Sequence, residues 1–361
     1  MQNKKCKKLW PGGNTTQGFY SYFDYIINPK ANRLFILKGG PGVGKSTFMK
    51  KISVKMSEKG YSIEEFYCSS SDNSLDALVI KELGVAFLDG TSPHMVDPKN
   101  PGVFDEIINL GDYLNTDLLV KNKEAIMSAN KEVGICFTRA YKYLSTLNPF
   151  IQDIEKIYKE SMNDHQFSRI HENLLKNTFK YADARNRIGS SRHLFSRGIT
   201  PSGIIDHQDT VFDFECINNI TYIKGNWGTG WEILLENTAK KAISLGYDVE
   251  IFHSPFAPSL IEDIVIPDLN IAITTKEKFM KSSSCIINLD SLADEQIIEK
   301  YREELEYDEK MFHELLNKSI EQIHKAKLAH DKLEDFYIPA MDFKAVNEMR
   351  EKIIQRIIEY A

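Results

Sequence analysis

The chain has 361 residues, 42% of them hydrophobic, which is enough for the cores of two ordinary globular domains. A net charge of −6 gives no general attraction to nucleic-acid phosphates, and no apolar run reaches the ~18 residues of a membrane-spanning helix. Neither nucleic acid nor a membrane is therefore an expected partner. Five scattered cysteines without a CxxC pair indicate a cytoplasmic protein, and the basic residues 1–8 lack the apolar run of a signal peptide.

The first predicted elements are a strand, a glycine-rich loop and a helix. Residues 33–38 have the apolar, β-favouring character of a buried strand, and residues 46–59 carry an apolar stripe at helical spacing that Gly60 can end. Between them, residues 39–46 read Gly-Gly-Pro-Gly-Val-Gly-Lys-Ser, a complete GxxxxGK[ST] phosphate-binding loop in the context that this motif requires. The sequence therefore predicts a site for the phosphates of a nucleotide.

The residue types of this loop specify its chemistry. Glycines allow backbone N–H groups to surround phosphate oxygens, and the N-terminus of the following helix adds its positive end. We expect Lys45 to reach the β- and γ-phosphates, Ser46 to bind Mg²⁺ through its hydroxyl, and Thr47 to face the α-phosphate. The predicted nucleotide-binding residues are Gly39, Gly40, Pro41, Gly42, Val43, Gly44, Lys45, Ser46 and Thr47.

A second magnesium ligand is predicted at the end of a later strand. A strand over 63–68, a short helix near 74–81 and a strand over 84–89 follow the loop. This alternation predicts a parallel sheet with helices on both faces and ligands at the carboxyl ends of its strands. Asp89 lies at such an end, and its role as the magnesium-side acid is favoured over a plain Asp-Gly turn.

Other polar residues near this edge are weaker candidates. Asp72 is expected to orient water or the outer shell of the metal, or merely to cap the next helix, and His94 is a weaker candidate still. No glutamate directly follows Asp89, so the sequence does not identify the group that activates water or accepts its proton.

A fourth strand is predicted over 106–110, and the composition then changes. Residues 117–188 are charged, helix-forming and nearly free of glycine, and residues 292–361 share this character. They predict a helical arm after each α/β core. The arm is either a lid or docking surface for a protein partner, or a set of helices that covers its own sheet; the second interpretation is slightly favoured.

The chain repeats itself at an offset of 186 residues. Residues 224–230 align with residues 38–44, including three of the loop glycines, and the register continues without a gap to the strand over 84–89. The sequence therefore predicts two tandem units, residues 1–188 and 189–361, with the same α/β fold.

The second unit has lost the residues that carry the chemistry. Trp231, Glu232 and Thr275 stand at the positions of the loop lysine, the loop serine and the magnesium-side acid. A carboxylate at the start of the helix repels phosphate where charge matters most. We therefore expect one active site, in the first unit, and a degenerate second unit.

Arginine is concentrated at the junction of the units. Arg185, Arg187, Arg192 and Arg197 are four of the ten arginines in the chain. Arginine often completes a phosphoryl-transfer site from a neighbouring domain, so one hypothesis is that this junction presents an arginine to the nucleotide. The alternative, a solvated linker and helix end, is favoured.

The segments 38–47 and 85–90 resemble the P-loop NTPase superfamily. With DGTSPH at 89–94 and RHLF at 192–195, the whole chain is similar to a poorly characterised bacterial family of tandem P-loop ATPases. The resemblance implies two P-loop NTPase-like units and the binding of ATP with Mg²⁺. The chain also resembles paired-domain arsenite-pump and septum-site ATPases, but their signature lysine lies five residues before the P-loop lysine whereas Lys38 lies seven before it, so their mechanism is not transferred.

Three functions follow as hypotheses. The first is Mg²⁺-dependent binding and slow hydrolysis of ATP, which drives a conformational change seen by a protein partner. The second is a small-molecule or nucleotide kinase, and the third is a nucleotide-sensing scaffold without useful turnover. The sequence does not distinguish ATP from GTP, because base contacts in this superfamily lie in variable loops.

Overall fold

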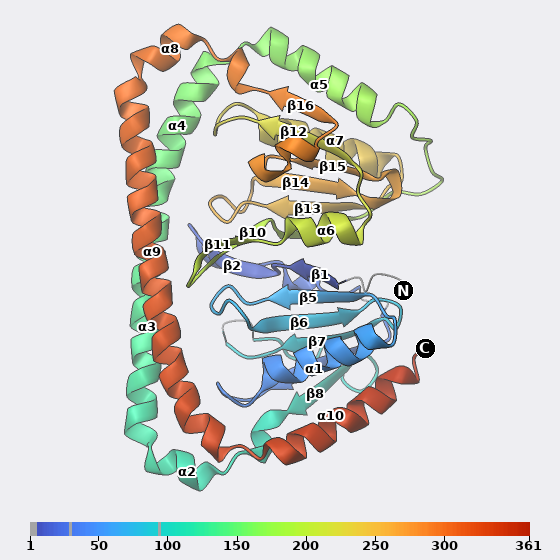
Figure 1. The fold of residues 1–361 in the computed structure, drawn as a ribbon, viewed down its shortest axis with the longest axis vertical. Coiled ribbons are helices and arrows are strands. Elements are labelled where there is room, and N and C mark those ends of the chain that lie inside the picture. Colours follow the sequence, from blue (N-terminus) through green and yellow to red (C-terminus); the bar gives the residue numbers. More distant parts are fainter. Residues whose placement is uncertain (1–5, 29–30, 93–94) are drawn as a thin grey trace.

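The computed structural model describes residues 6–28, 31–92 and 95–361. It is an α/β structure of two similar units, each built on a six-stranded sheet flanked by helices (Figure 1). The first repeat contains β1 (Cys6–Leu9), β2 (Gly12–Thr15), β3 (Gly18–Ser21), β4 (Arg33–Lys38), α1 (Lys45–Glu58), β5 (Ile63–Tyr67), β6 (Leu75–Ile80), β7 (Val85–Asp89), β8 (Asp105–Asn109), α2 (Thr116–Lys121), α3 (Lys123–Ser145), α4 (Leu147–Ser161) and α5 (Asp164–Thr178). The second repeat contains β9 (Ser191–Phe195), β10 (Arg197–Thr200), β11 (Gly203–Asp206), α6 (Gln208–Phe214), β12 (Asn219–Lys224), α7 (Trp231–Ser244), β13 (Val249–His253), β14 (Ile261–Ile266), β15 (Ile271–Thr274), β16 (Cys285–Asn288), α8 (Glu295–Lys300), α9 (Arg302–Tyr337) and α10 (Phe343–Ile358).

The second repeat reproduces the sheet and the main helices of the first, with the single helix α9 in place of α3 and α4. The strand orders β1-β5-β6-β7-β4-β8 and β9-β13-β14-β15-β12-β16 are the same order in the two repeats. Helices α1 and α7 begin 186 residues apart, whereas α5 and α10, which end the repeats, begin 179 residues apart. The predicted duplication is therefore confirmed at the level of the fold.

Each sheet is mixed rather than parallel, because residues 74–81 do not form the predicted helix. They contain β6, which pairs antiparallel with both β5 and β7. All six residues of β6 are buried, and a short, continuously buried run suits a strand covered on both faces. The remaining pairs in this sheet are parallel, so the carboxyl ends of β4, β7 and β8 lie at one edge.

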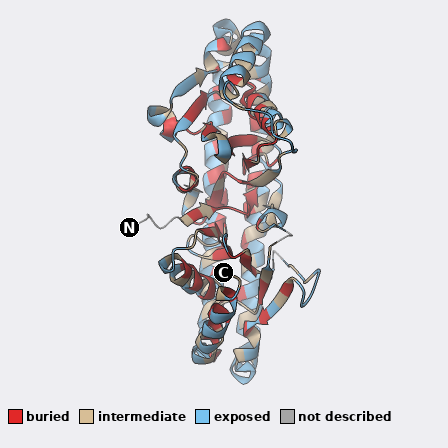
Figure 2. Cartoon of the chain, turned by 90° about the vertical axis from the view of Figure 1, so that its right-hand side faces the viewer, coloured by how far each residue is buried: buried red, intermediate tan, exposed pale blue. Residues whose placement is uncertain are grey.

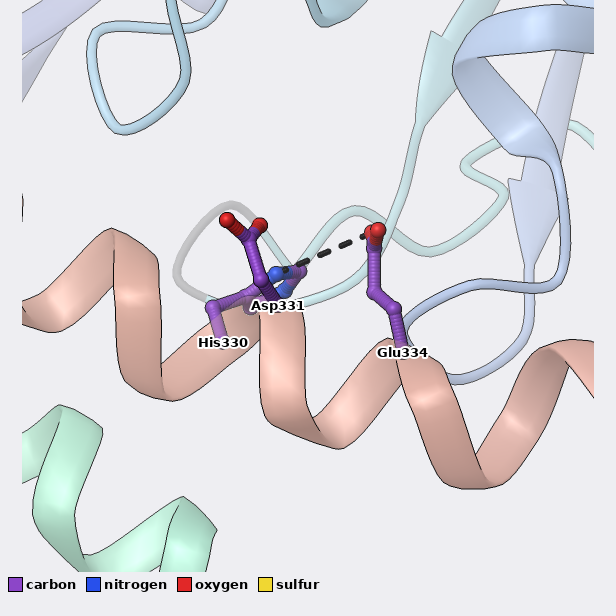
Figure 3. A group of neighbouring side chains, drawn as sticks. All are labelled: His330, Asp331 and Glu334. Carbon is purple, nitrogen blue, oxygen red and sulfur yellow. Dashed lines mark ion pairs between the residues drawn. The ribbon is translucent and has the colours of Figure 1, made fainter.

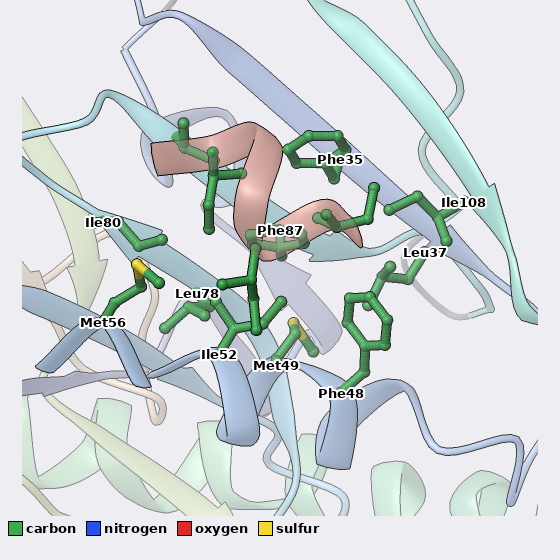
Figure 4. Packing of buried hydrophobic residues seen from close by; sticks show 14 of the residues in the cluster. Phe35, Leu37, Phe48, Met49, Ile52, Met56, Leu78, Ile80, Phe87 and Ile108 are labelled. Atoms are coloured by element: carbon green, nitrogen blue, oxygen red, sulfur yellow. The ribbon is translucent and has the colours of Figure 1, made fainter. Parts of the chain in front are cut away.

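Each repeat sends its last helix to the sheet of the other repeat. A repeat here is one half of the sequence, 1–188 or 189–361, and a unit is one six-stranded sheet with the helices that cover it. Helix α9 runs antiparallel to α3 and α4 along both units, and α10 then packs against α1 of the first unit (Figure 1). The hydrophobic core of the first unit, part of which is drawn in Figure 4, therefore also includes Val346, Ile353, Ile354 and Ile357 of α10. Likewise, Leu174 of α5 belongs to the core of the second unit. The favoured expectation that the arms cover their own sheets is wrong, because the helices are exchanged.

The two units meet near their edge strands β1 and β9. Trp10, which follows β1, forms an antiparallel bridge with Phe195, whose N–H donates to the Trp10 carbonyl at 3.0 Å. The indole of Trp10 also packs against Gly198 so closely that an added methyl group would lie 2.8 Å from the ring. Buried residues consequently continue from one unit into the other (Figure 2).

A buried charge network with the symmetry of the repeat holds this junction. Lys7 of the first repeat is fully buried and lies 2.5 Å from a carboxylate oxygen of Glu250 in the second. Arg192, the counterpart of Lys7, lies 2.7 Å from a carboxylate oxygen of Glu64, the counterpart of Glu250. Each repeat thus supplies a cation to a carboxylate of the other.

Candidate functional site

The loop between β4 and α1 folds back around the side chain of Lys45. Gly42 and Gly44 have φ angles of +68° and +93°, a region that glycine adopts without strain. Gly44 caps α1, and Lys45 Nζ donates hydrogen bonds to the carbonyl oxygens of Gly39 and Gly40, each at 3.0 Å. The ammonium group therefore lies at the loop, beside the N-terminus of α1.

Asp89 brings a carboxylate to the same place. It is the last residue of β7, where it pairs in parallel register with Leu37 of β4. Asp89 Oδ2 lies 3.6 Å from Lys45 Nζ, and Oδ1 accepts hydrogen bonds from the N–H and the hydroxyl of Thr91 at 3.0 and 2.6 Å. Two residues that are distant in the sequence, and that were predicted to share a site, are therefore neighbours.

Ser46 and Thr47 lie in the first turn of α1. Ser46 Oγ accepts a hydrogen bond from the N–H of Leu75 at 2.9 Å, which leaves its own proton and a lone pair for another partner. Thr47 is exposed and lines an open groove of about 280 Å³ between α1 and α10. Hydroxyl and carboxylate oxygens are the donors that Mg²⁺ prefers, so Ser46 and Asp89 have the chemistry to hold this ion.

Residues of the second repeat cover the outer side of the loop. A methyl group on Gly40 would lie 2.7 Å from the ring of Tyr337, and one on Gly42 would lie 3.2 Å from Cα of Glu334. The start of α10 is similarly close to the last loop glycine. Sequence reasoning missed Glu334 and Tyr337, because their proximity to the loop depends on the exchange of helices between the repeats.

A cluster of three ionisable side chains projects from this end of α9 (Figure 3). His330, Asp331 and Glu334 offer ligand atoms within 4.8 Å of one another, and His330 Nδ1 lies 3.7 Å from a carboxylate oxygen of Glu334. All three are partly exposed, and Asp331 also pairs with Lys327 at 2.7 Å. Groups of this kind can hold a cation, but they are also common on helix surfaces, so the cluster alone does not establish a metal site.

Asp72 contacts the second repeat. Ser202, in the turn between β10 and β11, donates a hydrogen bond to Asp72 Oδ2, while Oδ1 is buried without a hydrogen-bond partner. The next element is the strand β6, so the alternative that Asp72 caps a helix is wrong. Its suggested role in orienting water stays a prediction, and His94 lies outside the described residues.

The four arginines at the junction of the repeats are engaged elsewhere. Each forms an ion pair with a carboxylate that belongs neither to the loop nor to the end of β7: Arg185–Asp268, Arg187–Asp248, Arg192–Glu64 and Arg197–Glu262. The hypothesis that one of them faces the nucleotide is therefore wrong. Arg185 and Arg187 are partly exposed, as a solvated linker predicts, but Arg192 and Arg197 are mostly buried and serve in packing.

The second unit keeps the shape of the loop without its cation. Gly228 and Gly230 have φ angles of +88° and +89°, close to those of their counterparts in the first unit. Trp231, in place of the lysine, begins α7 and is buried in the core. Burial raises the pKa of the neighbouring Glu232 carboxyl. Where phosphate binding requires an ammonium group and a hydroxyl, the second unit therefore has a buried indole and an acid.

A comparison of this chain with protein-family models, curated proteins and solved structures finds no match. Any relation to nucleotide-binding proteins consequently depends on the motif and on the geometry of the loop. Within the ranges that the structure describes, no helix combines the length and the apolar character needed to cross a membrane.

Proposed function

We propose that this chain binds MgATP at the loop of the first unit and hydrolyses it, with one active site per chain. The observation that carries the proposal is the approach of the Asp89 carboxylate to Lys45 Nζ, 3.6 Å apart, at a glycine loop that leads into a helix. The glycine motif alone accounts for phosphate binding. A carboxylate at the end of the adjacent parallel strand adds the metal-binding partner that phosphoryl transfer from a nucleotide requires.

The surroundings of Lys45, Ser46 and Asp89 are consistent with a distinct role for each residue in binding MgATP. Lys45 Nζ has three donors, of which two are used by loop carbonyl oxygens, so one can point to the β- and γ-phosphates. The unpaired N–H groups at the start of α1 favour the same anion. Ser46 and Asp89 would hold Mg²⁺, which, when bound, neutralises charge on the phosphate oxygens.

Helix α9 provides a physical link from this site to the second unit. Its last turns contact the loop, and its 36 residues extend along α3 and α4 to α8, beside the second unit. A rearrangement of the loop after hydrolysis would therefore displace a helix that spans both units. We propose that a protein partner detects the nucleotide state through this arm.

Phosphate release from ATP, measured with and without Mg²⁺, tests the proposal. We expect release by the wild-type chain in Mg²⁺ and none in a chelator, and Lys45→Ala should reduce release to background. Trp231→Phe, at the equivalent position of the second unit, should leave the rate unchanged because it retains an aromatic core residue. Equal loss in both variants would refute a single site in the first unit.

A screen of phosphate acceptors distinguishes the other two hypotheses. Transfer to a small molecule that is faster than transfer to water would make the chain a kinase. Nucleotide binding without either reaction would make it a sensing scaffold.

A further inference from the structure

Of the acids that the sequence points to near the loop, Asp89 is engaged by Thr91 and Lys45, and Asp72 is tied to the other repeat through one of its oxygens. Asp89 accepts two hydrogen bonds from Thr91 and lies beside Lys45, an arrangement suited to a metal ligand. Asp72 is bound to Ser202 of the second repeat. Hydrolysis nevertheless needs a group that orients the attacking water and takes its proton. The residue after Asp89, where a glutamate is absent, is Gly90.

Glu334 is a carboxylate that the other repeat brings to this loop. Its Cα and Cβ lie 3.2 and 3.3 Å from the position that a methyl group on Gly42 would occupy. One turn later, Tyr337 packs on Gly40, whose carbonyl accepts a hydrogen bond from Lys45. Glu334 is 39% exposed and therefore hydrated, and its ion-pair partner His330 is on the preceding turn, 3.7 Å away (Figure 3). The side chain is thus available to a water molecule beside the loop.

The two repeats differ in the side chains that surround this glutamate. With the 179-residue offset of the C-terminal helices, Glu334 and Tyr337 correspond to Glu155 and Tyr158 of α4, which approach the degenerate loop in the same way. The helix therefore packs on both loops. His330 and Asp331, in contrast, correspond to Ile151 and Gln152. The His–Asp pair beside the glutamate is therefore found at the loop that retains its lysine, whereas the ionisable neighbours of Glu155 are Lys159 and Glu232.

We infer that Glu334 is the general base of the proposed ATPase, supplied to the first unit by the second repeat. This inference rests on the proposed function. The water oxygen attacks the γ-phosphorus, and the bond from that phosphorus to the β,γ-bridging oxygen breaks, leaving its electron pair on ADP. The proton of the water passes to the Glu334 carboxylate and then to solvent.

Matched substitutions in the two repeats test the assignment. Glu334→Gln keeps the shape of a partly exposed side chain, so the thermal midpoint should stay unchanged. We expect phosphate release to fall by ~10²–10⁴-fold, the usual contribution of a general base, while the affinity for MgATP stays within about threefold. Glu155→Gln, the equivalent change at the degenerate loop, should alter neither quantity.

Chemical rescue distinguishes a general base from a residue with a structural role, because an added carboxylate can replace the first but not the second. Added formate should partly restore phosphate release by Glu334→Ala, because a small carboxylate can occupy the vacated space, and it should not affect the wild-type chain. Near-normal release by Glu334→Gln overturns the inference and leaves the proposed function intact. Joint loss of binding and turnover, or no rescue by formate, also overturns it. A wild-type chain that takes up no nucleotide overturns both.

Discussion

Replacing Arg192 with methionine removes the main cation that compensates Glu64 at the junction of the two units. The guanidinium group donates two hydrogen bonds to this carboxylate, at 2.7 and 2.9 Å, and only 2% of the Glu64 side chain is exposed. Burial alone would raise the pKa of Glu64, but Arg192 outweighs it and holds the pKa at about 2. The ionised state of this buried carboxylate therefore depends on its cationic neighbours, of which Arg192 contributes most.

The expected loss of stability follows from what remains around Glu64. Removing one partner of a buried ion pair typically costs ~3–5 kcal/mol, because the other charge stays buried. Lys7 and Lys81 still lie 4.0 and 3.8 Å from Glu64, so part of the compensation survives. We therefore expect the lower end of this range, about 3 kcal/mol. Replacing both members with apolar residues should cost less than the single change, since no charge is then buried.

Urea unfolding, followed by far-ultraviolet circular dichroism, measures this loss. Arg187→Met is the matched control, because Arg187 also forms two hydrogen bonds with a carboxylate, that of Asp248, but both side chains are about half exposed. The control should lose much less stability than Arg192→Met, as expected for an exposed ion pair. If Arg192→Met loses no more than the control, the junction does not depend on this pair and the reasoning is refuted.

Three further predictions concern the junction and the exchanged helices. Gly198→Ala should lower stability by ~1–3 kcal/mol in thermal unfolding, because its methyl group would lie 2.8 Å from the Trp10 ring; an unchanged midpoint would show that the indole can move away. Ile354→Ala should lower the free energy of unfolding by ~2–5 kcal/mol, because this side chain of α10 is fully buried in the first unit. Amide hydrogen exchange should then become faster in β4 and β7 of the first unit before it does in β12 and β15 of the second. The reverse order would contradict the exchange of helices. Burial opposes ionisation of Glu262, but Arg197 and a neighbouring lysine lower the pKa of this carboxyl from 4.5 to about 2. The ionised Glu262 should therefore contribute its full stabilisation above pH 4.5, and this stabilisation should be lost as the pH falls toward 2. Acid titration of the unfolding midpoint measures this effect, and Glu262→Gln should reduce the slope in that window.

The loop and its neighbouring strand end are predictable because local chemistry determines them. The spacing of glycines, lysine and serine between a buried strand and a helix is a local signature, and the structure places Lys45 and Asp89 together as this motif predicts. The repeat was equally visible, since a fixed offset aligns whole elements. These features need no knowledge of how distant segments pack.

The errors have a common physical origin in tertiary structure. The alternation of strands and helices predicts a helix near 74–81, but Leu75–Ile80 form a strand whose six residues are all buried between neighbouring strands. Helix exchange was invisible because an apolar stripe does not specify which of two similar sheets it will cover. Glu334 was missed for the same reason, although aligning the helical arms would have shown that His330 and Asp331 have no ionisable counterparts in the first repeat.

The stoichiometry of MgATP binding, measured by isothermal titration calorimetry, tests the central claim most directly. We predict one binding site per chain in the wild type and in Trp231→Phe, and none in Lys45→Ala. Two sites per chain, or binding that survives the loss of Lys45, would contradict a single nucleotide site built on the first loop.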